Sequence, residues 1–234
     1  MFTDFIFNIK YLILIFNNKN ELKYSLTIMN TTFRNMSTSS LKSNGYLELI
    51  IGPMYSGKTS KLLEIYKQCK FCDISVCVIN HSFDKRYHDS MLSSHDKIMI
   101  PCLNTDDLHD LWFTNNSNDN LIRNSDVILI NEGQFFNKLH SVVSDMLKNN
   151  KSVYICGLDG DFERKKFGEI LDLIPLCDKV NKLTSLCSVC KNGTPGIFSM
   201  RITNEKEQTV IGSENYLPVC RICYDTKNDE NIIY

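Results

Sequence analysis

The segment GPMYSGKT, from Gly52 to Thr59, matches the pattern G-x-x-x-x-G-K-[S/T] at every fixed position. It lies between an apolar run and a helix-like segment, as this pattern requires, so a chance match in a structural turn is the weaker interpretation. Glycines let backbone N–H groups wrap around phosphates, and the N-terminus of the following helix attracts anions. We expect Lys58 to contact the β- and γ-phosphates of a nucleoside triphosphate and Thr59 to bind its Mg²⁺. The predicted phosphate-binding residues of this loop are Gly52, Pro53, Met54, Tyr55, Ser56, Gly57, Lys58 and Thr59.

A second group of polar residues follows the strand-like run 126–130, beginning with Asn131 and Glu132. Ligands of open α/β sheets bind at the carboxyl ends of the strands. Enzymes with this phosphate loop usually carry an Asp at the position of Asn131, where it orients Mg²⁺ and its waters. Glu132 is placed to act as a general base for a substrate hydroxyl. On spacing alone, a plain strand-to-helix loop with solvated polar groups remains the alternative.

The ten cysteines include two tight pairs, Cys187–Cys190 and Cys220–Cys223. Two C-x-x-C pairs supply four thiolates in tetrahedral geometry and leave no open position for water, which predicts a structural zinc site at Cys187, Cys190, Cys220 and Cys223. Disulfide bonds are the alternative. Scattered cysteines inside apolar runs favour a reducing compartment, and so a cytoplasmic location, over a disulfide framework. The further pair Cys69–Cys72 falls at the end of a helix and is interpreted as ordinary thiols.

The elements that must position these residues alternate between strands and helices. Apolar runs predict strands at 46–51, 75–79, 126–130 and 151–157, and helices are expected at 60–70, 106–113 and 138–148. Thr105 is the expected N-cap of the second helix. In the third helix, apolar residues recur at helical spacing. This alternation predicts an α/β fold with a mostly parallel sheet covered on both faces, ending at about Val180.

Length and composition fit one domain with a small appendage, since the chain has 234 residues and a net charge of −1. No basic excess points to nucleic acid. The apolar run 5–16 is too short to span a bilayer and lacks a basic leader, so no membrane association is expected. The expected division is a disordered or artefactual extension at 1–44, an α/β domain at 45–180, a zinc-binding domain at 181–226 and a tail at 227–234.

Several segments, in order, resemble the thymidine kinases found in animal cytosol, poxviruses and many bacteria, over about Tyr46 to Tyr224. The phosphate loop resembles that of the family, including Pro53 and Met54. The other similar segments are DKRY at 84–87, SHD at 94–96, NEGQFF at 131–136, GLDGDFERKKFG at 157–168, LIPL at 173–176, KLT at 182–184, VIG at 210–212, Tyr216 and VCRIC at 219–223.

The resemblance implies a P-loop NTPase-like α/β domain, followed by a small four-cysteine zinc domain whose segment 191–219 forms a lasso over the substrate. It implies that Glu132 deprotonates the 5′-hydroxyl of thymidine or deoxyuridine, and that Lys58 and Arg86 neutralise the transferring phosphoryl group. Asp84, Lys85, Arg86, Asn131 and Gln134 would belong to the side that binds Mg²⁺ and ATP. The implied nucleoside-binding residues are Met54, Leu158, Phe162, Phe167, Ser199, Gln208, Thr209, Val210, Ile211, Gly212 and Tyr216. A homotetramer and feedback inhibition by dTTP are implied as well.

This chain departs from the family pattern at three places. Asn131 replaces the acidic residue, which predicts weaker Mg²⁺ affinity but not inactivity. Ser213 replaces a second glycine, which is unfavourable only where φ is positive. The stretch 191–196 is about two residues longer than usual, and this affects the start of the lasso.

Two other functions are compatible with parts of the pattern. A zinc-ribbon P-loop ATPase acting on nucleic acid would carry basic clusters near the ribbon, but residues 201–217 contain Glu205, Glu207 and Glu214 beside Arg201 and Lys206. An inactive nucleotide sensor would have lost activity through Asn131, and the intact Glu132, Lys58 and Arg86 argue against it.

Overall fold

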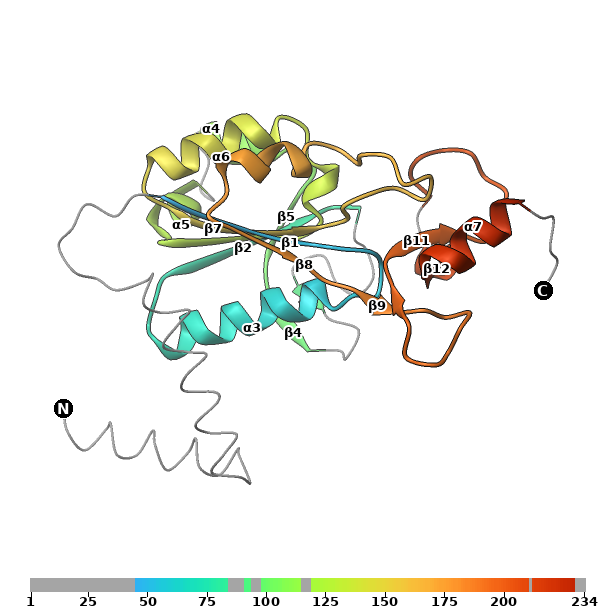
Figure 1. Cartoon of the computed structure of the whole chain (residues 1–234). Helices are drawn as coiled ribbons and strands as arrows, with labels where there is room; N and C mark the ends of the chain where they lie inside the picture. Colours follow the sequence, from blue (N-terminus) through green and yellow to red (C-terminus); the bar gives the residue numbers. More distant parts are fainter. Residues whose placement is uncertain (1–44, 84–90, 94–97, 115–118, 211, 230–234) are drawn as a thin grey trace, which may run out of the picture. The chain divides into compact units, whose positions relative to one another are not determined.

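A parallel sheet forms the centre of the structure (Figure 1). The computed structural model describes residues 45–83, 91–93, 98–114, 119–210 and 212–229, with backbone alone at 119–120 and 227–229. Six strands lie in the order β5-β2-β6-β7-β1-β8, and every neighbouring pair is parallel. In chain order these are β1 (Tyr46–Ile51), β2 (Val76–His81), β5 (Leu103–Thr105), β6 (Val127–Ile130), β7 (Ser152–Gly157) and β8 (Lys179–Lys182). The predicted α/β class and parallel sheet are confirmed.

Helices cover both faces of this sheet, with α3 on one face and α4 and α6 on the other (Figure 1). The central strands are therefore buried on both sides, which explains their continuous apolar sequences. The helices are α3 (Lys58–Phe71), α4 (Leu108–Phe113), α5 (Asp119–Asn124), α6 (Leu139–Lys148) and α7 (Arg221–Asp229), with 3-10 turns η1 (Gly133–Phe135), η2 (Ile170–Leu176) and η3 (Ser213–Asn215).

The core beside α4 and α6 takes alternate residues from each strand, as the two-residue period of a strand requires. From β1 it takes Leu47, Leu49 and Ile51, whereas Ile50 is buried on the opposite side of the strand. Helix α6 buries Leu139, Val142, Val143 and Met146, so the predicted amphipathic helix is confirmed within one residue at its start.

Two details of the sequence-based prediction were wrong. Thr105 is not the cap of α4, because it is the last residue of β5; the side chain of Asp107 accepts a hydrogen bond from the backbone N–H of Asp110 instead, at 2.9 Å. The alternating pattern also does not stop at Val180, because the polar edge strand β8 runs to Lys182 and pairs with β1.

The C-terminal part adds short antiparallel pairs beyond the sheet. Strands β9 (Ser185–Leu186) and β10 (Pro195–Gly196) pair, and so do β11 (Phe198–Arg201) and β12 (Tyr216–Val219). A small separate core forms around the cysteine pairs, with buried Met200, Val219 and Tyr224. Elsewhere in the chain, β3 (Met91–Ser93) and β4 (Met99–Pro101) form another antiparallel pair. In the described part of the chain, no helix is both long and apolar enough to cross a membrane.

Trp112, the single tryptophan of the chain, offers a direct test of the packing beside α6. Its side chain is buried, and its indole Nε1–H donates to Asp145 Oδ2 at 2.8 Å. We expect Asp145→Ala to lower the free energy of unfolding by about 1–3 kcal/mol, because it leaves a buried donor unpaired. Urea unfolding followed by tryptophan fluorescence measures this loss. Asp172→Ala, which removes an exposed ion pair with Lys166, is the control and should cost less than about 1 kcal/mol; equal effects would contradict the assignment.

Candidate active site and metal centre

The phosphate loop connects the end of β1 to the first turn of α3. Gly57 precedes the helix in a left-handed conformation with φ of 81°, which glycine adopts without steric cost. Gly52 is required by close packing, because a Cβ atom there would lie 2.5 Å from the carbonyl oxygen of Leu183. The Lys58 side chain is buried and folds back over the loop, where its Nζ donates to the carbonyl oxygen of Pro53 at 2.6 Å. The loop thus has the form of an anion cradle at a helix N-terminus.

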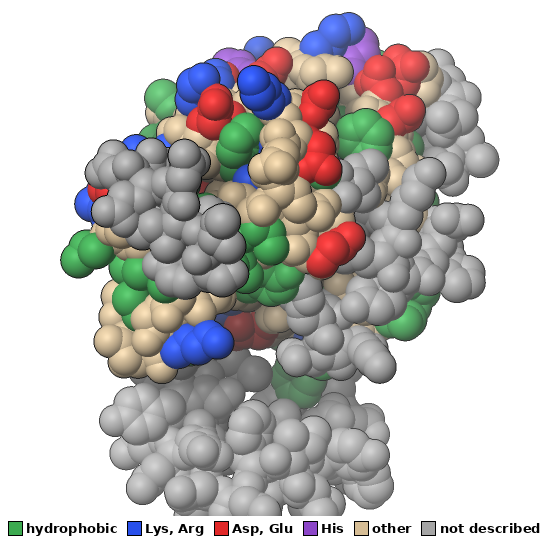
Figure 2. All heavy atoms as spheres, turned by 90° about the vertical axis from the view of Figure 1, so that its right-hand side faces the viewer, with side chains coloured by type: hydrophobic (Ala, Val, Ile, Leu, Met, Phe, Trp, Pro, Cys, Tyr) green, Lys and Arg blue, Asp and Glu red, His purple; other side chains and the backbone are tan. Residues whose placement is uncertain are grey.

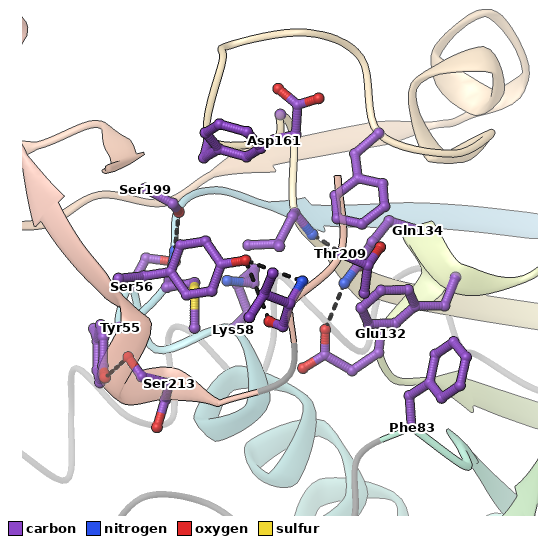
Figure 3. A pocket seen from close by; sticks show the side chains of 18 of the residues that line it. Tyr55, Ser56, Lys58, Phe83, Glu132, Gln134, Asp161, Ser199, Thr209 and Ser213 are labelled. Carbon is purple, nitrogen blue, oxygen red and sulfur yellow. Dashed lines mark hydrogen bonds between the residues drawn. The ribbon is translucent and has the colours of Figure 1, made fainter. Parts of the chain in front are cut away.

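Two hydrogen bonds connect the phosphate loop to the C-terminal part of the chain (Figure 3). The backbone N–H of Met54 donates to Ser199 Oγ at 2.9 Å, and the Tyr55 hydroxyl donates to the carbonyl oxygen of Ser213 at 2.8 Å. Ser213 is not among the residues with positive φ, so replacing glycine there costs little. These bonds bring segments far apart in sequence to the same side of one cavity.

Glu132 lies just beyond β6 in a left-handed conformation, with φ of 54°. Such a backbone is uncommon for a residue with a side chain and is found disproportionately at functional sites. Gln134 holds the Glu132 carboxylate from one side, because its Nε2 donates to Glu132 Oε2 at 2.7 Å (Figure 3). The Oε1 of Gln134 in turn accepts from the backbone N–H of Leu158 at 3.0 Å. The carboxylate is therefore oriented through the end of the neighbouring strand β7.

Asn131 points into the protein and not into the cavity. Its side chain is fully buried, and its Nδ2 donates to Asn80 Oδ1 at 2.7 Å. Its Oδ1 accepts from the thiol of Cys156 at 2.9 Å. Asn80 and Asn131 thus form a neutral amide pair at the carboxyl ends of the adjacent strands β2 and β6.

A cavity of about 360 Å³ lies between the phosphate loop, Glu132 and the β11–β12 region, a size typical of small-molecule sites. From the predicted phosphate side it brings together Met54, Tyr55, Ser56, Gly57, Lys58, Thr59, Glu132 and Gln134. From the predicted nucleoside side it brings together Leu158, Phe162, Phe167, Ser199, Gln208, Thr209, Val210, Gly212 and Tyr216. Gly52, Pro53 and Asn131 do not line it, and Asp84, Lys85, Arg86 and Ile211 lie outside the described residues.

Several lining residues were not predicted from the sequence, among them Phe83, Phe135 and Asp161. The rings of Phe135 and Phe167 meet edge to face with centroids 5.4 Å apart, and so do those of Phe83 and Phe135 at 5.6 Å. Phe135 belongs to the NEGQFF segment, which could have marked it. Asp161 occupies a variable position of the motif around Phe162, so no sequence signal singled it out.

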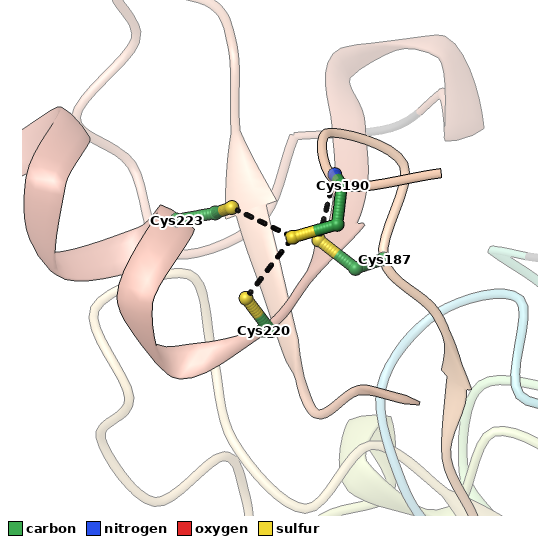
Figure 4. Close-up of side chains that lie close together, drawn as sticks. All are labelled: Cys187, Cys190, Cys220 and Cys223. Carbon is green, nitrogen blue, oxygen red and sulfur yellow. Dashed lines mark hydrogen bonds between the residues drawn. The ribbon is translucent and has the colours of Figure 1, made fainter. Parts of the chain in front are cut away.

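The four paired cysteines gather in one cluster (Figure 4), with their Sγ atoms all within 4.8 Å of one another. Cys190 Sγ lies 3.7 Å from Cys220 Sγ and 3.4 Å from Cys223 Sγ. Disulfide sulfurs lie about 2.05 Å apart, so these are free thiols. A tetrahedral zinc ion with Zn–S bonds of about 2.3 Å needs sulfurs about 3.8 Å apart, and the cluster fits such an ion.

The pKa values of the thiols in this cluster are shifted in opposite directions. Burial raises the pKa of Cys187, but backbone N–H groups of Cys190, Cys220 and Val189 outweigh it and lower that pKa to about 6. The hydrogen bond with Cys190 raises the pKa of Cys223. Four thiolates at these distances need a cation to neutralise them, which is what a bound dication supplies.

The other cysteine pair has no such environment. Burial raises the pKa of the Cys69 thiol to about 11, and burial also raises that of the exposed Cys72. Reactive cysteines have lowered pKa values. Both residues therefore behave as ordinary thiols, in agreement with the prediction.

Helix α7, which carries Cys223, also supports the wall of the cavity. The Tyr224 hydroxyl donates to the carbonyl oxygen of Phe162 at 2.5 Å, and Arg164 Nη1 donates to Asp225 Oδ1 at 2.7 Å. The guanidinium of Arg164 lies over the Tyr224 ring at 4.3 Å. The cysteine cluster and the cavity wall are therefore connected through α7.

The arrangement defines a P-loop nucleotide-binding protein in which a four-cysteine metal module closes the ligand cavity. The family model described as "Thymidine kinase" matches residues 45–224. The chain is 41% identical to the thymidine kinase of sheeppox virus (strain KS-1) over 77% of this chain and 97% of that protein. It is 38% identical to the thymidine kinase of Yaba monkey tumor virus, over 77% and 95% of the two chains. It is 36% identical to thymidine kinase 1 of Dictyostelium discoideum, over 80% of each. The chain belongs to the thymidine kinase family.

Proposed function

We propose that this protein transfers the γ-phosphoryl group of ATP to the 5′-hydroxyl of thymidine, and also accepts deoxyuridine. The observation that carries the proposal is the single cavity that joins the phosphate loop, the Glu132 carboxylate and an apolar wall. Family membership over 45–224 supplies the class of reaction. The product is the nucleoside monophosphate, a precursor for dTTP and DNA synthesis.

In the proposed reaction Glu132 accepts the proton of the 5′-hydroxyl as its oxygen bonds to the γ-phosphorus, and the bond to the β–γ bridging oxygen breaks to release ADP. A general base of this kind typically increases the reaction rate by about 10²–10⁴-fold. Lys58 and Arg86 neutralise charge on the transferring group, and Thr59 contacts the Mg²⁺ that accompanies ATP. In this proposal, the side of the site that binds the phosphate donor ATP includes Asp84, Lys85 and Gln134.

The proposed nucleoside site lies between aromatic walls and the backbone of residues 208–212. Phe162 and Phe167 line the cavity beside Leu158 and Met54, so the base would stack on apolar surface while backbone groups read its polar edge. Residues 191–219 form the proposed lasso, fixed at both ends by a structural zinc ion. The same proposal includes domains at 45–180 and 181–226, a homotetramer and inhibition by dTTP. It also includes a cytoplasmic location, which suits the free thiols.

A nucleic-acid-dependent ATPase is a poorer fit. Figure 2 shows acidic and basic side chains interspersed on the face that carries the C-terminal part, whereas nucleic-acid sites concentrate basic charge. Arg201, which would have to be exposed to contact nucleic acid, is buried. An inactive sensor would not need the oriented carboxylate of Glu132.

Glu132→Gln tests the catalytic base. We expect the rate of dTMP formation from labelled ATP and thymidine to fall by about 10²-fold or more, because the amide cannot accept the proton. ATP binding should remain, since the phosphate loop is untouched. Glu163→Gln removes a carboxylate from an exposed ion pair with Lys165 and should keep the parent rate. A Glu132→Gln variant as active as the parent would assign the base elsewhere.

Asn131→Asp tests the effect of the neutral amide pair on Mg²⁺. A carboxylate at this strand end adds negative charge near the phosphates, so the Mg²⁺ concentration for half-maximal rate should fall by about three- to tenfold. Asn204→Asp, which adds the same charge to an exposed loop, should leave it unchanged. If Asn131→Asp does not change the Mg²⁺ dependence of the rate, the amide of Asn131 does not weaken Mg²⁺ binding.

Metal analysis tests the cysteine cluster. We expect about one zinc ion per chain in the purified protein, and its loss in Cys223→Ser. Because α7 supports the cavity wall through Tyr224, this variant should also melt at a lower temperature and bind thymidine more weakly. Cys72→Ser, at an exposed thiol outside the cluster, should keep both zinc and stability. Purified protein without zinc would exclude the assignment.

A further inference from the structure

The loop that follows β11, residues 202–210, covers the cavity with Gln208, Thr209 and Val210 (the lid loop). Most of its side chains are exposed, so it has little apolar burial of its own to hold it in place. Its position over the cavity must therefore come from specific polar contacts with the rest of the protein.

Arg201, at the base of the lid loop, supplies the first set of contacts. Its buried guanidinium donates to the carbonyl oxygens of Glu205 at 3.0 Å and Gln208 at 3.1 Å, and to that of Glu207 at 2.5 Å. It also lies over the Phe162 ring at 3.7 Å. These bonds give the lid loop its internal shape. Arg201 also donates to the Tyr216 hydroxyl at 2.5 Å, and that hydroxyl donates to the carbonyl oxygen of Val210 at 3.2 Å. This first set therefore holds the lid loop to β12, the strand that pairs with β11, and to the Phe162 ring.

Asp161 supplies a contact from the opposite side of the cavity. Its Oδ1 accepts from the backbone N–H groups of Glu163 at 3.0 Å and Lys165 at 2.8 Å, which makes the 161–165 turn rigid. Its Oδ2 accepts from Gln208 Nε2 at 2.7 Å. The Asp161 side chain is buried and lines the cavity, whereas Gln208 is the lid loop's own residue.

We propose that the Asp161–Gln208 hydrogen bond is a latch that positions the lid loop over the nucleoside, with Asp161 as a positioning residue. The inference deepens the proposed function and rests on it. Three features favour this role: the acceptor is a buried carboxylate, its second oxygen is fixed by a rigid turn, and the bond joins two walls of one cavity. Charge-assisted bonds of this kind are stronger than neutral ones.

The latch predicts an effect on nucleoside binding that a reciprocal exchange can reverse. Gln208→Glu places a second carboxylate against Asp161, so the lid loop should detach from the wall. We expect KM for thymidine to rise about tenfold, with kcat and KM for ATP within about twofold of the parent. Adding Asp161→Asn to Gln208→Glu restores one donor and one acceptor, and should return KM for thymidine to within about threefold of the parent.

Asn204→Asp is the matched control, because it adds the same charge to the lid loop away from the latch and should leave both KM values unchanged. Melting temperatures of all variants identify any loss of folding. An active parent whose Gln208→Glu variant matches the control, or a double variant as weak as Gln208→Glu, would overturn the latch while leaving the proposed function intact. A parent unable to phosphorylate thymidine or deoxyuridine would overturn both.

Discussion

The strand order β6-β7-β1 is the constraint on which the site depends. All three strands are parallel, so their carboxyl ends meet at one edge of the sheet. The phosphate loop leaves β1, Glu132 leaves β6, and Leu158 follows β7 between them. The Glu132–Gln134–Leu158 chain of hydrogen bonds runs from the end of β6 to the end of β7, and it requires these two strands to be neighbours. The Glu132 carboxylate and the phosphate loop are thus placed by backbone pairing before any ligand is present.

The C-terminal part supplies the side of the cavity that the edge of the sheet does not form. Its contribution is organised by the cysteine cluster, which fixes the start of α7, and α7 then holds the turn beside Phe162 through Tyr224. A metal ion held by these four thiolates would have no open position for a substrate. It would substitute for the hydrophobic core that such a small segment cannot build, because the separate core of this segment contains few residues.

Much of this arrangement could be predicted from the sequence where the signal is local. The phosphate loop and the amphipathic helix α6 depend on residues close together in the chain, and both were found. Strand β8 was missed because an edge strand of polar residues lacks the apolar run of a buried one. Asp161 and Arg201 were missed as site residues because their partners lie in other segments, such as Gln208, and only the folded chain brings them together.

The bond between Met54 and Ser199 joins residues 145 positions apart in the chain. During synthesis the ribosome therefore releases the phosphate loop long before the segment that covers it exists. The strands, helices and Glu132 can assemble in that interval, but the part of the cavity wall that contains Ser199, Gln208 and Tyr216 is absent until the C-terminal segment has emerged. A chain interrupted shortly after the sheet would keep the phosphate loop, Phe162 and Phe167, but one side of the cavity would be open. Closure of the cavity must therefore wait for synthesis of the C-terminal segment.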